Sequence, residues 1–165
     1  MSTLKVNKII PVAGVPTGGG GGIVQVVTKT ELFTSNVSTT STSFINLTST
    51  LNTFITPISQ TSKIFVIMTA PVYAANSYNG GIASFAIGRN GSTINGDDYS
   101  YADMYVNASG QSYMPLTMHI LDSPGTTSQT GYNFMCRTNS SSNAVGIGAY
   151  GRNEAVSITL MEVSA

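Results

Sequence analysis

Charged side chains are scarce in this sequence. Seven lysines and arginines balance seven aspartates and glutamates, and together they make up 8% of the 165 residues, compared with about 25% in ordinary soluble domains. A protein that binds a phosphate backbone needs clustered lysines and arginines, whereas the seven in this chain are scattered along it. The composition therefore argues against nucleic acid as a partner.

Cysteine and long apolar runs are also lacking. Cys136 is the only cysteine, so the chain cannot form an intrachain disulfide, and its alternation with Phe134 and Tyr132 predicts a buried thiol. No apolar run approaches the roughly 18 residues of a membrane helix, and the opening MSTLKVNKII has no apolar core of a secretory signal peptide. We therefore expect no membrane insertion and no signal peptide, and stability must come from burial or assembly.

The shortage of histidine and carboxylate leaves little room for catalysis. His119 would have to serve any Ser-His-Asp triad, but no Gly-X-Ser-X-Gly motif accompanies it. We expect it to face solvent or a subunit interface, with a metal ion on a threefold axis as an alternative. Asp97, Asp98 and Asp103 cluster in GDDYSYAD and favour a solvated turn, with a Ca²⁺ site or a glycosidase pair as alternatives. The expectation is a protein that is not an enzyme, with no cofactor and no resident metal.

Five consecutive glycines, residues 18–22, stand before the β-branched run IVQVV. A phosphate-binding loop would need a helix start and a Lys-Ser or Lys-Thr pair directly after the glycines, and the sequence has neither. We interpret the glycines as a linker. Residues 1–17 before it form an extended anchoring peptide, because Pro11 and Pro16 prevent a regular helix and an apolar tail favours docking onto another surface. The predicted anchoring side chains are Leu4, Val6, Ile9, Ile10, Val12 and Val15.

Residues 23–165 are expected to form one all-β domain. Short strand-like segments alternate with turn clusters of Gly, Asn, Asp and Ser, and a helical period is almost absent. This pattern predicts an antiparallel β-sandwich of the jelly-roll type. The predicted strands are residues 23–30, 43–50, 63–73, 81–89, 104–108, 113–121, 131–138, 144–150 and 155–163.

Alternation within three of these segments predicts their faces. In residues 113–121 and 155–163, large apolar side chains alternate with polar ones, so each strand should bury one face. Residues 64–68, IFVIM, are apolar on both faces, which indicates a central strand or one whose outer face a second subunit covers. We therefore expect an oligomer.

Eight tyrosines outnumber six phenylalanines. Tyr78, Tyr99 and Tyr101 fall in predicted loops among Asn, Ser, Gly and Asp, a composition that suits adaptable recognition surfaces, including surfaces that bind sugars. The alternative is that these tyrosines lie at sandwich edges or at a subunit interface. They are the candidate surface-recognition residues, with a cell-surface glycan as the partner.

Several motifs resemble those of one group of proteins: STLKVNKI, IPVAGVPT followed by glycines and IVQV, TPISQTSKI, LDSPGTT, YGR and ITLMEV. Over nearly the whole chain, the sequence resembles small structural proteins of tailed bacteriophages, especially marine ones. The resemblance implies a fibre, tail or head-decoration protein on the exterior of the virion. It also implies a trimeric β-sandwich knob whose N-terminal peptide attaches to a capsid or tail protein, and it implies no particular binding residue.

These observations predict a non-enzymatic virion structural protein. Residues 1–17 would attach a homotrimer to the particle, and residues 23–165 would face outward, where they can bind the host surface. Three attachment peptides on one trimer would add avidity. The alternatives are a capsid cement protein with no receptor role, a carbohydrate-binding module, and a polysaccharide-degrading enzyme that uses Asp97, Asp98 and Asp103.

Overall fold

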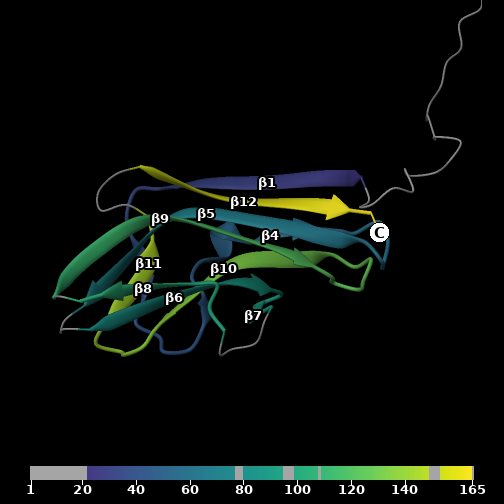
Figure 1. Cartoon of the computed structure of the whole chain (residues 1–165). Coiled ribbons are helices and arrows are strands. Elements are labelled where there is room, and N and C mark those ends of the chain that lie inside the picture. Colours follow the sequence, from purple (N-terminus) through teal and green to yellow (C-terminus); the bar gives the residue numbers. More distant parts are fainter. Residues whose placement is uncertain (1–21, 77–79, 95–98, 108, 149–152, 165) are drawn as a thin grey trace, which may run out of the picture.

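The computed structural model describes residues 22–76, 80–94, 99–107, 109–148 and 153–164. The predicted arm (residues 1–17) and all but the last residue of the glycine linker (residues 18–22) lie outside these ranges. The described residues form an antiparallel β-sandwich of two sheets (Figure 1), as the sequence predicts. The elements are β1 (Ile23–Phe33), β2 (Val37–Thr39), β3 (Ile45–Asn46), the 3₁₀-helix η1 (Ser49–Leu51), β4 (Thr53–Ile55), β5 (Lys63–Asn76), β6 (Gly81–Arg89), β7 (Ser92–Thr93), β8 (Ala102–Val106), β9 (Gly110–Asp122), β10 (Thr130–Thr138), β11 (Ala144–Ile147) and β12 (Glu154–Val163).

Strand β5 is the centre of the first sheet, sheet A. It pairs along one side with β9 and along the other side first with β12 and then with β11. Strand β1 lies beyond β12, and β2 lies beyond β11. In the second sheet, sheet B, β10 has β6 on one side and the short β3 and β4 on the other, and β7 and β8 pair with the far side of β6.

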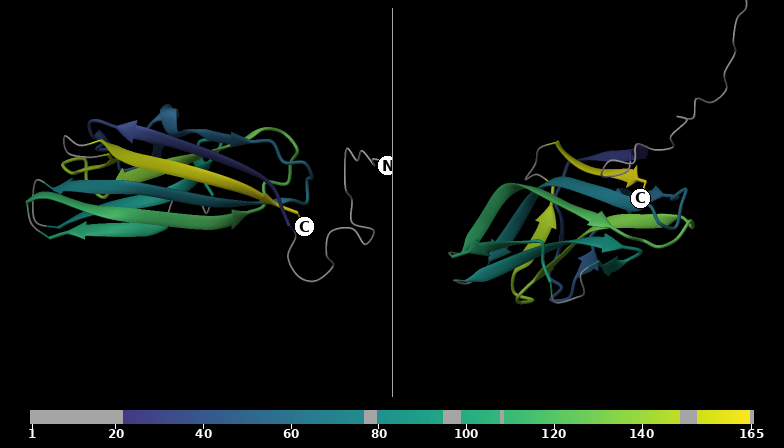
Figure 2. Two further views of the ribbon diagram at one scale, coloured as in Figure 1. Left: turned by 90° about the horizontal axis from the view of Figure 1, so that it is seen from above. Right: turned by 45° about the vertical axis from the view of Figure 1, so that its right-hand side comes forward.

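The connections between the sheets follow the jelly-roll order. Sheet A contains the strand order β1-β12-β5-β9, and sheet B contains β3/β4-β10-β6-β8. The chain passes from one sheet to the other at most of its connections, so that the first strand lies beside the last. This is the double Greek key of a jelly roll, and the left view of Figure 2 shows β1, β12, β5 and β9 of sheet A side by side.

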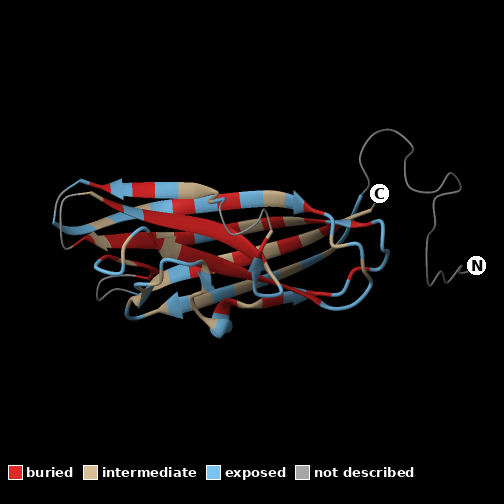
Figure 3. Ribbon diagram, turned by 90° about the horizontal axis from the view of Figure 1, so that it is seen from below, coloured by how far each residue is buried: buried red, intermediate tan, exposed pale blue. Residues whose placement is uncertain are grey.

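Alternating apolar residues form the core between the layers (Figure 3). Ile64, Val66 and Met68 of β5 are fully buried, and β5 has the central position that was one of the two alternatives predicted for residues 64–68. From sheet B, Phe85 and Phe134 meet them and contact each other edge to face, with ring centroids 5.9 Å apart. The inward residues of β12 and β9 complete the core: Val156, Ile158, Leu160, Leu116 and Met118.

Three predicted strands are shorter or shifted in the structure. In residues 43–50, only Ile45–Asn46 is a strand, because Thr48 caps the 3₁₀-helix η1 with its hydroxyl oxygen, which accepts from the N–H of Thr50. The strand predicted at residues 104–108 is shifted to Ala102–Val106, where it pairs with β6. Strand β11 ends at Ile147 instead of residue 150, before Gly148 with a φ of +91°. The short strands β2, β4 and β7 were not predicted.

The two ends of the described body lie side by side. The backbone N–H of Ser164 donates to the carbonyl of Gly22 at 3.1 Å, and Ile23 pairs with Val163. Strand β5 starts at this end, with Lys63 opposite Val163, and runs to Asn76 opposite Gly110 at the other end. Its 14 residues span roughly 45 Å at about 3.3 Å per residue, so the body has two well-separated poles.

Candidate functional site

The predicted recognition tyrosines do not form one described surface. Tyr99 is 66% exposed, whereas Tyr101 is half-buried, packs against the core and donates its backbone N–H to the carbonyl of Phe85 at 2.8 Å. Tyr78 lies outside the described residues. Of the predicted recognition tyrosines, the structure describes Tyr99 and Tyr101, and of these two only Tyr99 is as exposed as a recognition surface requires.

The candidate metal and catalytic residues are dispersed as far as the structure describes them. Asp103 lies in β8, exposed and opposite Ser84, in place of the predicted turn. His119 is exposed on β9, where its ring contacts Phe65 edge to face at 5.9 Å between centroids. No group of three or more His, Cys, Asp or Glu residues that could hold a metal occurs in the described ranges; Asp97 and Asp98 fall outside them. Cys136 is fully buried, and burial raises the pKa of its thiol to about 12, which confirms the predicted buried thiol.

A row of hydroxyls crosses the outer face of sheet A. Thr30 pairs with Ser157, Ser157 with Thr69, and Thr69 with Thr117, so one residue of each of β1, β12, β5 and β9 lies in the row. The Oγ1 atoms of Thr69 and Thr117 are 3.2 Å apart. Cross-strand threonine pairs of this kind stabilise a sheet face, and the row itself contains no charged side chain.

A parallel apolar row lies four residues further along the same face. It contains Val26, Met161, Phe65 and Leu121, again one from each strand. Val26 is 54% exposed and Leu121 is 50% exposed. In the described strands β1, β12, β5 and β9, no carboxylate faces outward. We call this four-strand surface the sheet A face, and large apolar groups left to water in a row are typical of an interaction surface.

Glu162 holds together the pole where the chain enters the body. Its carboxylate is fully buried and accepts hydrogen bonds from Nε2 of Gln25 at 2.6 Å and from the backbone N–H of Ile58 at 2.8 Å. Burial alone would raise the pKa of Glu162, but hydrogen bonds from Gln25, Ser62 and the backbone of Ile58 and Ser59 outweigh it and hold the pKa below its ordinary value. The strand pairing shifts register between Ile23 and Gln25, so this charge fixes an irregular strand start.

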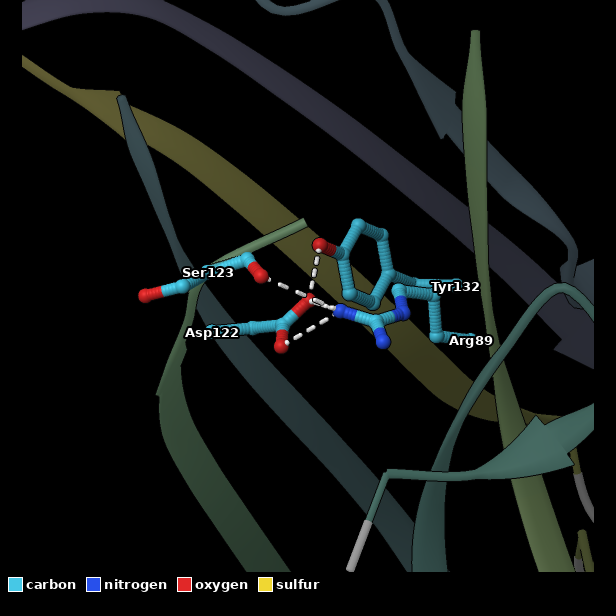
Figure 4. A network of polar contacts seen from close by, with 4 residues as sticks. All are labelled: Arg89, Asp122, Ser123 and Tyr132. Carbon is cyan, nitrogen blue, oxygen red and sulfur yellow. Dashed lines mark hydrogen bonds and ion pairs between the residues drawn. The ribbon is translucent and has the colours of Figure 1, made fainter. Parts of the chain in front are cut away.

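A second polar network joins the two sheets (Figure 4). Nη1 of Arg89 on β6 lies 2.9 Å from both carboxylate oxygens of Asp122 on β9, and the hydroxyl of Tyr132 on β10 donates to the same carboxylate at 2.7 Å. Asp122 is 6% exposed and Tyr132 is fully buried. Burial and the neighbouring carboxylate raise the pKa of Tyr132 far above its ordinary value. The network therefore keeps a neutral phenol and an ion pair, and its role is to connect edge strand β9 with sheet B.

The sequence reasoning missed most of the sheet A face. It identified residues 64–68 as apolar on both sides, but did not connect them with Val26, Leu121 and Met161. A signal for the rest of this face was present in β1, in which Val26, Thr28, Thr30 and Leu32 occupy every second position. These four residues are exposed in the structure, whereas the residues between them are half-buried. Which strands adjoin β5 depends on the jelly-roll order, and no local pattern gives that order.

Comparisons with known proteins add little to this geometry. No protein-family model matches this sequence, and a search of curated proteins finds no match. A solved structure, described as that of infectious bursal disease virus, Gx strain, aligns with 86% of this chain and 31% of its own, at 11% identity and a TM-score of 0.34. This chain thus spans about a third of the length of that one, and the similarity is too low to indicate a shared function. Within the described residues, no helix is long and apolar enough to cross a membrane.

Proposed function

We propose that this protein is a non-enzymatic structural component on the exterior of a virion. Residues 1–17 attach it to a capsid or tail protein, the glycines give the attachment reach, and the jelly-roll body assembles with further copies and faces outward. The motif resemblance to tailed-phage structural proteins is one support. The observation that carries the proposal is the body with two separate poles. At one pole the backbone N–H of Ser164 donates a hydrogen bond to the carbonyl of Gly22, so the chain enters the body at that end.

This arrangement suits attachment and display. The apolar segment of residues 1–17 joins the body at the pole of Ile23 and Val163. The opposite pole, near Asn76 and Gly110, lies roughly 45 Å away by strand length. A particle bound at the first pole therefore leaves the second pole free for contact with other molecules.

The sheet A face supplies the contact between copies. Strands of about ten residues, four of them about 4.8 Å apart, cover roughly 600 Å², which is the low end of what each partner buries in a stable protein interface, about 600–1,000 Å². The face is uncharged across its hydroxyl row and apolar along its second row, so burying it removes apolar area and costs little desolvation of charge. We propose a homotrimer formed through this face.

A deletion tests the attachment. Particles assembled with the full chain should contain the protein, whereas particles assembled with a chain that begins at residue 18 should not, because the apolar anchor is gone. Mass spectrometry of purified particles gives the readout. Circular dichroism of the shortened chain should retain the β-sheet spectrum, because the first strand of the described body begins at Ile23.

A matched variant separates apolar docking from reach. Replacing Leu4, Val6, Ile9, Ile10, Val12 and Val15 with serine keeps the length of the arm and should also abolish incorporation. Replacing glycines 18–22 with alternating Gly and Ser should leave incorporation unchanged. Incorporation of the shortened chain at the level of the full chain would contradict the anchoring role.

A further inference from the structure

A hollow of about 300 Å³ lies on the outer face of sheet B, on the side of the sandwich away from the sheet A face. Its volume is at the lower end of the range for small-molecule sites, about 300–1,000 Å³. Glycines beside the hollow let its lining side chains lie close against the sheet. A Cβ at Gly88 would lie 2.1 Å from Oδ1 of Asn133, and a Cβ at Gly131 would lie 2.8 Å from the ring of Phe54. The main lining residues are Asn46, Asn52, Phe54, Asn90, Gly131 and Asn133.

An aromatic ring borders this hollow and is open to solvent. Phe54 pairs with Gly131 across strands β4 and β10, and its ring lies over that glycine. The ring is 50% exposed although it belongs to a sheet. It therefore offers an apolar face next to polar groups, as a binding site for an amphipathic ligand requires.

Four asparagines supply neutral donors and acceptors around the ring. Asn52 accepts from Nδ2 of Asn46 at 2.9 Å, and Asn90 accepts from the N–H of Gly131 at 2.9 Å, both through Oδ1. Because their Oδ1 atoms already accept these hydrogen bonds, Asn52 and Asn90 can offer a ligand the donors of their Nδ2 groups.

Two amide oxygens at the hollow lack partners. Within the described part of the chain, Oδ1 of Asn46 and Oδ1 of Asn133 are buried and have no hydrogen-bond partner, and Asn133 as a whole is 3% exposed. Buried polar groups in folded proteins are normally paired. A ligand that brings hydroxyl donors would satisfy such oxygens after a small rotation of the amides.

We propose that this hollow binds a neutral sugar residue of a glycan, with the apolar face of the pyranose ring on Phe54 and its hydroxyls on the asparagine amides. No charged side chain lines the hollow, so an ionic ligand such as a phosphate or a carboxylate would lose its hydration without gaining an opposite charge. A peptide strand would need a free sheet edge for its backbone, whereas this site lies on a sheet face. This inference deepens the proposed function and rests on it, because a particle displays the site only if the protein is a component of the virion.

Nuclear magnetic resonance of the isotope-labelled full chain tests the site. The probes are methyl α-glucoside, methyl α-mannoside, methyl β-galactoside and N-acetylglucosamine, each titrated to about 100 mM, which detects dissociation constants in the millimolar range typical of weak single-site contacts. At least one probe should shift the side-chain amide signals of Asn52, Asn90 and Asn133 and the backbone signal of Gly131 in a saturable way. Absence of saturable shifts at these signals for all four probes would overturn the inference.

Substitutions locate the binding. Phe54→Ala should weaken the affinity by about tenfold or more, because it removes the stacking face, and Asn52→Ala should weaken it severalfold without touching the core. Tyr99→Ala is the matched control, an exposed aromatic residue outside the hollow that should leave the affinity unchanged. A loss of binding in Tyr99→Ala together with normal binding in Phe54→Ala would place the sugar at the loop tyrosines and overturn the assignment.

The proposal and the proposed function fail separately. If the chain binds a sugar at the hollow but particles do not incorporate it, the result would contradict the virion role and support the sugar site. Normal incorporation by a chain that binds none of the sugars would keep the virion role and remove the site.

Discussion

Among single residues, Glu162 is the clearest case of a charged side chain that stabilises the fold. Its carboxylate is buried, yet its pKa lies below the ordinary value because Gln25, Ser62 and two backbone N–H groups donate to it. A carboxylate held by several donors stabilises the folded state in its charged form. Its partners lie 137 and 104 residues away in sequence, so the sequence alone could not indicate this role.

The variant Glu162→Gln is expected to lower the free energy of unfolding by about 1–3 kcal/mol, because an amide nitrogen would face N–H donors. The folded pKa is below the unfolded one, so the stabilisation is present above the unfolded pKa and is lost as pH falls through the folded pKa. Urea unfolding between pH 7 and pH 3 should show the wild-type advantage shrinking with acid. Glu154→Gln on the same strand is the control, and an equal loss in both variants would contradict this account.

Tyr132 gives a second prediction at this scale. Tyr132→Phe removes the hydroxyl that donates to Asp122 at 2.7 Å and leaves the Arg89 ion pair in place. We expect a loss of about 1–2 kcal/mol, because Asp122 keeps its charged partner but loses one donor. Tyr105→Phe, at a tyrosine that is 62% exposed, should be neutral in the same urea titration. A neutral result for Tyr132→Phe would mean that the phenol is not needed to join the sheets.

Single residues also show where sequence patterns stop. The alternation around Cys136 predicted its burial correctly, because positions on the same face of a strand are two residues apart. Tyr101 was expected on a recognition surface, but the start of β8 turns it toward the core. Phe54 received no functional interpretation, since its exposure follows from Gly131 on a strand more than seventy positions later.

At the scale of elements, long strands were predictable and short ones were not. Strand β6 has the predicted bounds, and β5, β9, β10 and β12 differ by a few residues at most, because each carries an alternating or continuous apolar pattern over many positions. Strands β2, β4 and β7 have three residues or fewer. Such short strands form because a neighbouring strand in the sandwich has free backbone N–H and C=O groups. Which strand is the neighbour depends on the tertiary fold, so a local sequence pattern does not predict them.

Strand β11 depends on one glycine. Gly146 lies between β2 and β5, and a Cβ there would be 2.2 Å from the carbonyl oxygen of Val37 and 2.7 Å from the ring of Tyr73. Gly146→Ala should therefore push β2 away and cost about 1–3 kcal/mol, as overpacking does. Thermal unfolding by circular dichroism measures the loss. Gly22→Ala is the control, because nothing lies within 4 Å of the added atom; equal melting temperatures for the two variants would refute the close approach.

At the scale of the whole molecule, the two outer faces of the sandwich differ. The sheet A face presents a hydroxyl row and an apolar row across four strands, whereas sheet B presents small residues, glycines and the asparagine hollow. An assembly through the first face leaves the second face open. In the proposed function, residues 1–17 attach the protein, the sheet A face joins the copies, and the hollow on sheet B binds the sugar. Phe54 of the hollow is two residues from Thr56, whose carbonyl accepts from Gln25, so the hollow lies toward the pole where the chain enters the body.

This division predicts how charge will act on each face. Thr69 is exposed at the middle of the hydroxyl row, so Thr69→Lys should be tolerated by one folded copy but should place three lysines in a trimer contact, where like charges repel and lose solvation. Light scattering should give a mass near three times 17.2 kDa for the wild type and near one chain for this variant. Ile82→Lys, on the outer side of sheet B and 37% exposed, should remain a trimer. If Thr69→Lys keeps the wild-type mass, the copies must meet elsewhere, and the sheet A face would then remain an exposed apolar surface that the particle itself has to cover.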